Sequence, residues 1–393
     1  MRTFIISVVA GLLVWATTTS AQNTKNVFSI NHGPYLQEVT ETGATFVFNT
    51  SKPSFSYIEL RKKGEEAGTD YYSASYGLRQ AYAEFHAIRA ESLQPATEYE
   101  YRIHAKEMRK FHPYNVIFGD SIMSPWYSFS TVNPLQEGGS IFITSDMHSR
   151  PELLKRLLEL CNYQTCTAFF YAGDMMNYLE HGGEHPFTSF IDTSVEMFAT
   201  TIPFELVRGN HETRGDLARQ FPTFFPKSTG KLYGSYRLGD VMVIMLDSGE
   251  DKSDSHPVYA QLTDFNGYRT EQAEWLKRLC ASPEYKEARY HIVISHFPMV
   301  MNEKSKQENM WYGWQDAINK FLPILNEADV DLLVSGHTHQ YEYYPAGSKD
   351  ANFPVLVQGF SSAVRLDLKE GNIQCKVINQ DNEVLQESVL RVK

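Results

Sequence analysis

Two histidines stand two positions apart at the end of an apolar run, in the stretch DLLVSGHTHQY at 331–341. The apolar run is typical of a strand buried on both faces, and His337 and His339 follow it directly. Either a strand ends in polar residues that have no special role, or it delivers two imidazole ligands to a metal ion. One motif does not decide between these interpretations, so the test is whether the rest of the chain supplies matching ligands.

Four further apolar runs end in the same way, in SDMHS, AGDMMN, RGNHET and ISHFP; their polar residues are Asp146, His148, Asp174, Asn210, His211 and His296. Taken alone, a Gly-Asp pair or a single histidine is more often a turn or a surface residue. In open α/β sheets, however, the carboxyl ends of the strands form the ligand crevice, so we expect all five ends to converge. Coincidence is a poor explanation for the whole ordered set.

The spacing within the set fits metal binding. The side chains of residues i and i+2 of a strand point to the same face, so Asp146 and His148 can bind one ion. A bridging carboxylate can hold two cations about 3.5–4 Å apart, which clamps the attacking and leaving oxygens of a displacement. Mixed imidazole and carboxylate ligands suit Mn, Fe or Zn better than Ca or Mg.

The elements that must position these residues follow two different patterns. From about residue 28 to 133, short alternating runs between turn residues predict strands, as in a β-sandwich of immunoglobulin or fibronectin type. The segment NPLQEGGS, 133–140, is typical of a domain joint. Beyond it, buried apolar runs alternate with amphipathic helical segments, which predicts a layered α/β domain. We therefore expect a signal peptide at 1–21, an all-β domain at 26–133 and an α/β domain with the motifs at 138–393.

Composition and charge limit the classes of function. The chain has 393 residues, 42% of them hydrophobic and 21% charged, as expected of a globular protein. Its formal net charge of −11 opposes binding to nucleic acid or to an anionic membrane. Anionic substrates are still compatible with this charge, because bound cations reverse the field locally.

The N-terminus has the pattern of an export signal. Arg2 precedes an apolar stretch at 4–16 and small residues that end at Ala21, and the apolar stretch is too short to span a bilayer. We expect cleavage near Ala21 and a soluble protein in the periplasm or outside the cell, without a membrane anchor. In such a compartment some cysteine pairing and buried free thiols are both plausible; the cysteines are Cys161, Cys166, Cys280 and Cys375.

The ordered set D-x-H, G-D, G-N-H-E, H and G-H-x-H resembles the motifs of the calcineurin-like metallophosphoesterases across the whole C-terminal domain. This resemblance implies two sheets flanked by helices and a two-metal site. The first metal would be held by Asp146, His148 and His339, the second by Asn210, His296 and His337, and Asp174 would bridge both. His211 would stay off the metals, where it protonates a leaving oxygen or stabilises charge on the phosphoryl group. Glu212 would orient a ligand from behind.

The N-terminal half resembles the small domain that precedes purple acid phosphatases, through GPYLQ at 33–37 and YSFSTVNP at 127–134. The segment LQPATEYEYRI also resembles the fibronectin type III corner, where a tyrosine hydroxyl bonds to the backbone. The residues that carry this resemblance are Leu93, Pro95, Thr97, Tyr99 and Tyr101. The metal motifs depart from that family. Purple acid phosphatases place a tyrosine three residues after the bridging aspartate and lack the histidine of D-x-H. Here Asn177 takes that position, Tyr178 comes one place late and His148 is present, so we expect neither a ferric-tyrosinate site nor the purple colour.

Several residues around the motifs have two interpretations each. His181 and His185 contact substrate or belong to a solvated loop, and the loop is favoured because Gly and Pro lie between and beside them. Arg208 and Arg214 make bidentate phosphate contacts or, as we favour, salt bridges. An aromatic cluster is a platform for a ring of the substrate or packs at a helix start; it contains Trp311, Tyr312 and Trp314.

Together these features predict an exported phosphoesterase with two Mn, Fe or Zn ions, which hydrolyses small phosphomonoesters by in-line attack of a metal-held hydroxide. A phosphodiesterase or nucleotidase on the same site is the alternative among enzymes. A binding or adhesion protein that has lost catalysis is the alternative of a different class, and the complete ligand set argues against it.

Overall fold

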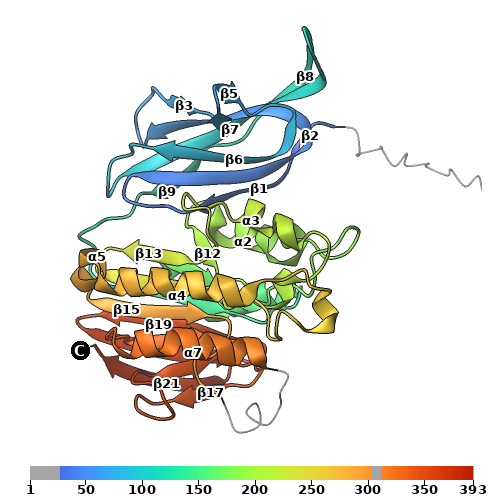
Figure 1. The fold of residues 1–393 in the computed structure, drawn as a ribbon. Helices are drawn as coiled ribbons and strands as arrows, with labels where there is room; N and C mark the ends of the chain where they lie inside the picture. Colours follow the sequence, from blue (N-terminus) through green and yellow to red (C-terminus); the bar gives the residue numbers. More distant parts are fainter. Residues whose placement is uncertain (1–26, 302–310, 393) are drawn as a thin grey trace, which may run out of the picture.

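The computed structural model describes residues 27–301 and 311–392, in which an all-β part is stacked on a larger α/β part (Figure 1). The predicted export signal, 1–21, lies outside the described residues. Within them, no helix has both the length and the apolar character needed to cross a membrane.

The all-β part is a sandwich built around one long strand. Its strands are β1 (Ile30–Gln37), β2 (Gly43–Lys62), β3 (Thr69–Tyr71), β4 (Ala74–Ser75), β5 (Leu78–Arg79), β6 (Ala83–Glu91), β7 (Glu98–His112), β8 (Asn115–Met123) and β9 (Tyr127–Ser130). The first half of β2 pairs with β1 and β6, and its second half pairs with β3 and β7. The pairing breaks between Asn49 and Ser54, so β2 passes from one layer to the other there.

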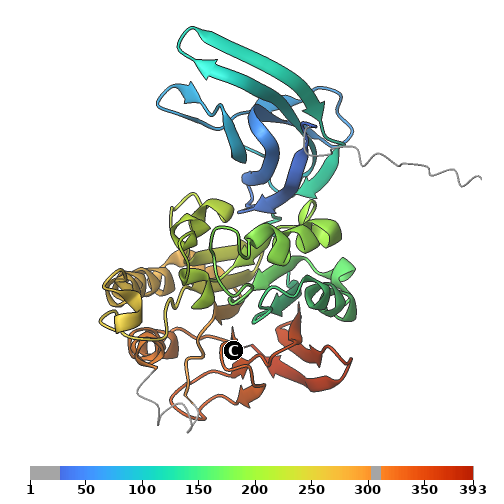
Figure 2. The same ribbon diagram turned by 90° about the vertical axis from the view of Figure 1, so that its right-hand side faces the viewer.

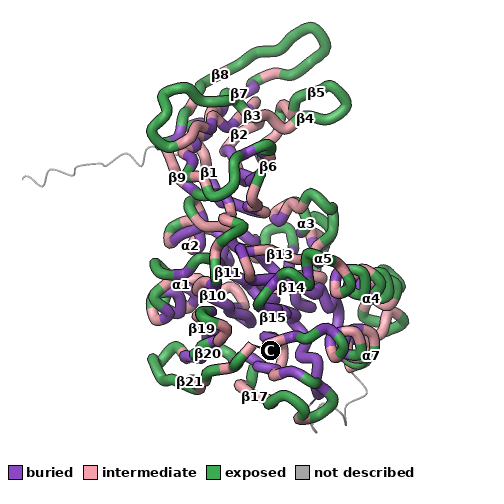
Figure 3. The backbone as a smooth tube through the Cα atoms, turned by 90° about the vertical axis from the view of Figure 1, so that its left-hand side faces the viewer, coloured by how far each residue is buried: buried purple, intermediate pink, exposed green. Residues whose placement is uncertain are grey.

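Rings from both layers fill the core of the sandwich, among them Phe46, Tyr101 and Phe129. The hydroxyl of Tyr99 accepts a hydrogen bond from the backbone N–H of Gln94 at 2.9 Å, which is the kind of contact that the corner motif predicts. The all-β character predicted for this half is confirmed; its likeness to fibronectin type III and the domain boundaries stay predictions. The hairpin of β7 and β8 projects from the sandwich as an exposed arm (Figure 3).

The α/β part contains two six-stranded sheets. Its strands are β10 (Gly139–Thr144), β11 (Ala168–Tyr171), β12 (Phe204–Leu206), β13 (Gly234–Leu238), β14 (Val241–Leu246), β15 (Tyr290–Ser295), β16 (Leu332–Ser335), β17 (Glu342–Tyr344), β18 (Val355–Val357), β19 (Ser362–Lys369), β20 (Asn372–Asn379) and β21 (Val384–Arg391). The strand orders are β12-β11-β10-β19-β20-β21 and β13-β14-β15-β16-β18-β17. Every residue of β14, β15 and β16 is buried, because each sheet is covered on both faces.

Helices cover the outer faces of both sheets (Figures 1 and 2). They are α1 (Pro151–Leu160), α2 (Asp192–Ser194), α3 (Phe221–Phe224), α4 (Phe265–Ala281), α5 (Pro283–Glu287) and α7 (Tyr312–Asn326). One core cluster joins α1 and the helical segment 187–199 to the first sheet, another joins α4 and α7 to the second, and a third lies between the sheets. The predicted layered α/β sandwich is therefore confirmed.

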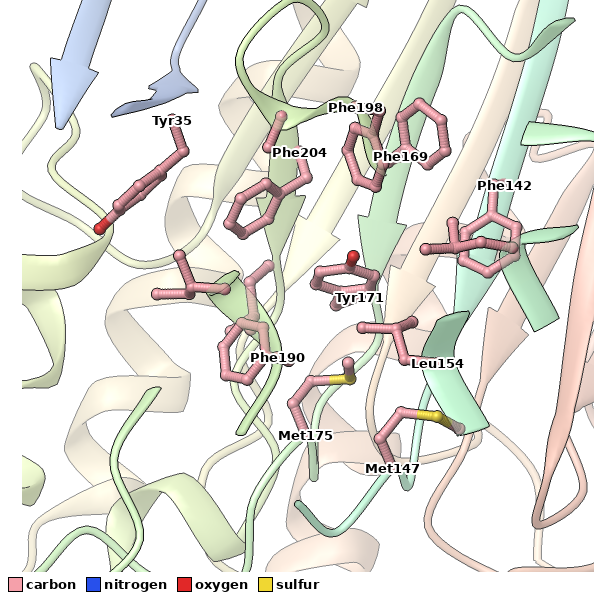
Figure 4. Close-up of a cluster of buried hydrophobic side chains, with 14 of the residues drawn as sticks. Tyr35, Phe142, Met147, Leu154, Phe169, Tyr171, Met175, Phe190, Phe198 and Phe204 are labelled. Carbon is pink, nitrogen blue, oxygen red and sulfur yellow. The ribbon is translucent and has the colours of Figure 1, made fainter. Parts of the chain in front are cut away.

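Aromatic packing connects the two parts of the chain (Figure 4). Tyr35 of β1 stacks on Phe204 of β12 with ring centroids 5.7 Å apart, and its hydroxyl donates to the carbonyl of Phe224 at 2.7 Å. Gln37 donates to the carbonyl of Phe204 at 2.6 Å. The sandwich thus rests on the β12 edge of the first sheet. All four cysteines are free thiols in the structure.

Candidate metal centre

The five motifs follow the carboxyl ends of five strands, as the sequence predicts. In the first sheet, Asp146 follows β10, Asp174 follows β11, and Asn210 and His211 follow β12; in the second, His296 follows β15, and His337 and His339 follow β16. Since the two sheets pack face to face, these ends meet on one side of the α/β part.

Two groups of side chains there have the composition of metal sites. Asp146, His148, Asp174 and His339 form one group, and Asp174, His296 and His337 form the other. Within each group, every residue offers a ligand atom within 4.8 Å of the others. Asp174 belongs to both groups, and its carboxyl is buried.

The donor chemistry of the second group fits a cation. Nδ1 of His296 lies 2.8 Å from the carbonyl of Ala172, which fixes the proton on that nitrogen. Nε2 lies 3.1 Å from Oδ2 of Asp174 and 3.1 Å from Oδ1 of Asn210, so it either carries a proton between these oxygens or, once that proton is replaced by a metal ion, is an acceptor. Three acceptors that face one another repel unless a positive charge lies among them.

The pKa values of His296 and Asp174 also indicate that this site stabilises positive charge. Burial alone would lower the pKa of His296, but the nearby carboxylates of Asp174 and Asp146 raise the pKa to about 10. Burial would likewise raise the pKa of Asp174, yet His296 and His211 hold that pKa below its ordinary value. The site is therefore organised around carboxylates that need cations beside them.

The first group shows the same arrangement of acceptors. Nδ1 of His148 lies 3.0 Å from the amide oxygen of Asn177, so Nε2 of the neutral ring carries the lone pair. That nitrogen lies 3.1 Å from Nε2 of His339, which itself lies 3.3 Å from Oδ1 of Asp146. Asn210 completes the second group through Oδ1, 3.1 Å from Nδ1 of His337.

The local backbone of the D-x-H motif differs from the prediction. Asp146 and His148 do not lie in a strand; β10 ends at Thr144, and both have positive φ angles, 55° and 45°. Asp174, His337 and His339 also have positive φ angles. A turn of this kind costs energy for residues other than glycine, and such strain is common at functional sites. The prediction that i and i+2 strand geometry aligns the two ligands was wrong, and a tight turn aligns them instead.

Buried methionines and backbone hydrogen bonds hold that turn. Met147 and Met175 are fully buried directly after Asp146 and Asp174, so each ligand is anchored by its neighbour (Figure 4). The N–H of Asp146 donates to the carbonyl of Gly173, and that of His148 donates to the carbonyl of Asp174, both at 3.0 Å. The two ligand loops are thereby joined into one unit.

Gly209 is required by close packing behind the carboxylate that the two groups share. A Cβ atom at this position would lie 2.3 Å from Oδ1 of Asp174 and 2.5 Å from its backbone nitrogen. Only glycine fits such an approach without displacing the ligand.

Glu212 holds the loops from behind, as the sequence predicts for a residue that orients a ligand. Its buried carboxylate accepts hydrogen bonds from the backbone N–H groups of Asp174, Met175 and Gly209 at 2.7–2.9 Å. Burial and the neighbouring charge of Asp174 raise the pKa of Glu212 to about 7. The backbone bonds, rather than a direct contact with a candidate ligand side chain, fix the position of Asp174.

Asn177 and Glu184 are positioning residues that the sequence did not reveal as such. In the sequence Asn177 is only a departure from the tyrosine of purple acid phosphatases, yet in the structure its amide oxygen orients His148 and its backbone carbonyl lies 3.0 Å from Nδ1 of His211. Glu184 accepts from the backbone N–H of Asn177 at 2.6 Å, from its amide at 2.7 Å, and from the hydroxyl of Ser149. No motif indicates Glu184, because its partners come from separate loops.

His211 lies beside the two groups without joining either. Its Nε2 is 3.9 Å from Oδ2 of Asp174, and its backbone N–H donates to Oδ1 of the same carboxyl at 2.9 Å. Nη1 of Arg214 lies 3.5 Å from the same Nε2, while Nε and Nη2 of Arg214 donate to Glu250 at 2.9 Å each. Arg214 therefore makes the salt bridge that the sequence favours, and its Nη1 atom remains beside His211.

The other flanking residues lie outside the two ligand groups. Arg208 is ion-paired with the buried carboxylate of Asp247 at 3.0 Å. His181 pairs with Asp216 on the surface, and His185 packs its ring against Phe187. The salt bridge of Arg208 and the exposed position of His181 agree with the roles that the sequence favours, whereas His185 is half-buried rather than solvated.

Aromatic side chains border the site. Trp314 is buried and donates to the carbonyl of Pro298, which makes it a packing residue. Trp311 contacts the ring of His337 edge-on at 5.1 Å, and Tyr312 is exposed. Phe360, which carries no sequence signal, is 44% exposed and lies 5.2 Å from the ring of His339.

Residues 139–341, just over half of the chain, match the family model described as Calcineurin-like phosphoesterase. The chain belongs to this family. It is 26% identical over 233 residues to purple acid phosphatase 22 of Arabidopsis thaliana, which covers 56% of this chain and 48% of that protein. It is 23% identical over 168 residues to the human serine/threonine-protein phosphatase CPPED1, which covers 42% and 49%.

Solved structures show the same architecture. Purple acid phosphatase PPD1 from yellow lupin matches with a TM-score of 0.66 at 14% identity, over 91% of this chain and 74% of that one. PhoD matches with a TM-score of 0.59 at 10% identity, over 91% and 88%. The chain's matches span about a third to a half of the length of the curated relatives. The chain thus combines the family's α/β sandwich with an N-terminal sandwich as part of one purple acid phosphatase-like architecture.

Proposed function

We propose that this calcineurin-like phosphoesterase hydrolyses phosphomonoesters with two divalent or mixed-valence transition metal ions. The observation that carries the proposal is the pair of ligand groups that share the buried carboxyl of Asp174. The relatives named purple acid phosphatase and serine/threonine-protein phosphatase support an activity on phosphate esters.

The ligands divide between the ions according to the two groups. Asp146, His148 and His339 would hold the first ion, Asn210, His296 and His337 would hold the second, and Asp174 would be shared by both. Imidazole nitrogens with carboxylate and amide oxygens suit Mn, Fe or Zn. When bound, the ions supply Lewis acidity toward the phosphoryl oxygens and lower the pKa of water near neutrality.

The side chains around the ions supply the remaining functions. His211 protonates the leaving oxygen through Nε2, since Nδ1 is held by the carbonyl of Asn177. Nη1 of Arg214 stabilises charge on the phosphoryl group from the same side. The carbonyl of Ala172 and the amide of Asn177 keep His296 and His148 in the tautomers that leave Nε2 free to bind metal.

Export is part of the proposal and depends on the sequence of residues 1–21. Cleavage near Ala21 would place the enzyme in the periplasm or outside the cell. N-terminal sequencing of the protein isolated from its native host tests this directly: a mature N-terminus near Gln22 supports export, and an intact Met1 contradicts it.

The activity is tested with protein freed of metal by chelation and then supplied with Mn, Fe or Zn. We expect para-nitrophenyl phosphate to be hydrolysed faster than the bis-para-nitrophenyl diester, and Asp174→Asn to abolish turnover. Hydrolysis of the diester alone would favour the alternative, a phosphodiesterase. Absence of hydrolysis with all three metals, together with absence of metal binding, would contradict an enzyme function.

A further inference from the structure

A cavity of about 450 Å³ is lined by Arg214, whose Nη1 atom lies 3.5 Å from Nε2 of His211. Its walls come from the loop that follows G-N-H-E and from the loop that follows β14 (Val241–Leu246), and they include Arg214, Arg219, Glu250 and Lys252. A smaller cavity of about 220 Å³ continues from it and shares Thr213, Arg219 and Leu262. The two cavities form one trough, called the Arg219 trough below, which is large enough for a small organic group.

Arg214 connects the trough to the reaction centre. Its Nε and Nη2 atoms are bound to Glu250, and the carboxylate of Glu250 is also bonded to the hydroxyls of Thr213 and Tyr259 at 2.6 Å each. The guanidinium is therefore fixed in orientation, with Nη1 3.5 Å from Nε2 of His211. Arg214 therefore lies between His211 and the Arg219 trough, and it is the residue through which the trough reaches the candidate reaction centre.

The larger cavity of the trough has more cationic than acidic side chains in a chain whose net charge is −11, while Asp264 and the ion-paired Arg208 line the smaller cavity. Three cationic side chains and one carboxylate line the larger cavity; they are Arg214, Arg219, Lys252 and Glu250. Arg214 is neutralised by Glu250, and Lys252 contacts Asp251 at 2.6 Å. Arg219 donates to the carbonyl of Leu262 at 3.2 Å and has no acidic partner within the described residues. Its charge is thus available to an anion.

Apolar side chains at the rim complete the lining. Val258 is 65% exposed and Leu262 is 67% exposed, although both border the larger cavity. Exposed aliphatic groups beside fixed charges suit a ligand that has an apolar body and one anionic end.

We propose that the Arg219 trough binds the leaving group of the substrate, and that this alcohol carries a second anionic group, a carboxylate or a further phosphate, that pairs with Arg219. This inference rests on the proposed phosphomonoesterase activity and adds the substrate class to it. The bond that breaks is the P–O bond to the alcohol, whose oxygen takes a proton from His211 while water supplies the new oxygen on phosphorus.

The test compares substrates that differ in one charge. The pair 4-carboxyphenyl phosphate and 4-carbamoylphenyl phosphate have leaving groups of the same shape, and only the first is an anion beyond the ester phosphate. We expect the wild-type kcat/KM to be about tenfold higher for the carboxylate, because a hydrogen bond between charged groups contributes about that factor. Fructose 1,6-bisphosphate against fructose 6-phosphate tests a further phosphate in the same way.

The variant Arg219→Gln tests whether the preference for an anionic leaving group depends on the charge of Arg219. We expect it to reduce the ratio of the two kcat/KM values to near one. Arg156→Gln is the matched control, because Arg156 is also exposed, also donates to one backbone carbonyl, that of Gln380, and lines neither cavity of the trough. The control should keep the wild-type ratio.

The outcomes separate this inference from the proposed function. Hydrolysis of both phenyl phosphates at equal kcat/KM, with no bisphosphate preference, overturns the leaving-group site and leaves the phosphomonoesterase activity intact. A preference for anionic leaving groups that survives Arg219→Gln also overturns it. If neither substrate is hydrolysed and no metal is bound, the proposed function fails and the inference fails with it.

Discussion

Replacement of Asn177 by alanine should weaken metal binding at the first site and leave the second site unchanged, because it removes one hydrogen bond to His148 of the first site. The amide oxygen of Asn177 is the partner of Nδ1 of His148, at 3.0 Å. The variant removes this oxygen but keeps the backbone carbonyl that holds His211. Nothing around His296 changes, since that ring is anchored by the backbone carbonyl of Ala172.

The size of the effect follows from the role of the lost bond. A hydrogen bond that orients a ligating histidine typically contributes 10- to 100-fold in metal affinity, or about 1.4 to 2.7 kcal/mol. Glu184 loses one donor, the amide of Asn177, but retains the N–H of residue 177 and the hydroxyl of Ser149. We therefore expect the affinity of the first site to fall by about this factor, while the second site keeps its affinity.

The assay is a titration of metal-free protein with Zn²⁺ or Mn²⁺ in competition with a chromophoric chelator, fitted with two affinities. Asn319→Ala is the control, because Asn319 is exposed on α7 and, among the described residues, its side chain bonds only to Gln315 on the same helix. An equal loss at both sites, or no loss at either, would refute the assignment of Asn177 to the first site.

Four other predictions follow from the structure. His211→Asn should lower kcat by about 10²–10⁴-fold with unchanged metal content by mass spectrometry; undiminished turnover would contradict its role. Gly209→Ala should lower the free energy of unfolding in urea by about 1–3 kcal/mol, because its Cβ would lie 2.3 Å from Oδ1 of Asp174. Burial lowers the pKa of His86 from 6.5 to about 4, so the unfolded chain gains the proton first and the free energy of unfolding should fall as pH drops below about 6.5. In the wild type, about 2–3 kcal/mol of the fall in the free energy of unfolding between pH 7 and pH 4.5 should come from His86. Urea unfolding of His86→Gln should therefore show a fall that is smaller by this amount; an unchanged fall would refute this. The iron-loaded protein should show no tyrosinate charge-transfer band, since Tyr178 is 48% exposed and belongs to neither ligand group.

The sequence predicts the fold and the candidate ligands because both depend on local patterns. Apolar runs mark strands covered on both faces, and polar residues directly after them mark the edge where strand ends meet. The ligand group around Asp174, drawn from strands far apart in the chain, is therefore foreseeable from the order of the motifs.

The geometry within the site is less predictable, because it depends on contacts between loops. The turn at Asp146 and His148 is stabilised by bonds to the carbonyls of Gly173 and Asp174, which no local pattern encodes. Glu184 has three donors from two loops, and Arg219 becomes notable only beside a cavity. In each case the partner is distant in sequence or depends on the shape of the surface.

The most direct test of two cations held around one shared carboxylate is anomalous diffraction from crystals grown with Mn²⁺ or Zn²⁺. The structure predicts two peaks about 3.5–4 Å apart, one on each side of the carboxyl of Asp174, with His148 and His296 bound to different ions. A single peak, or two peaks that do not share residue 174, would contradict the account.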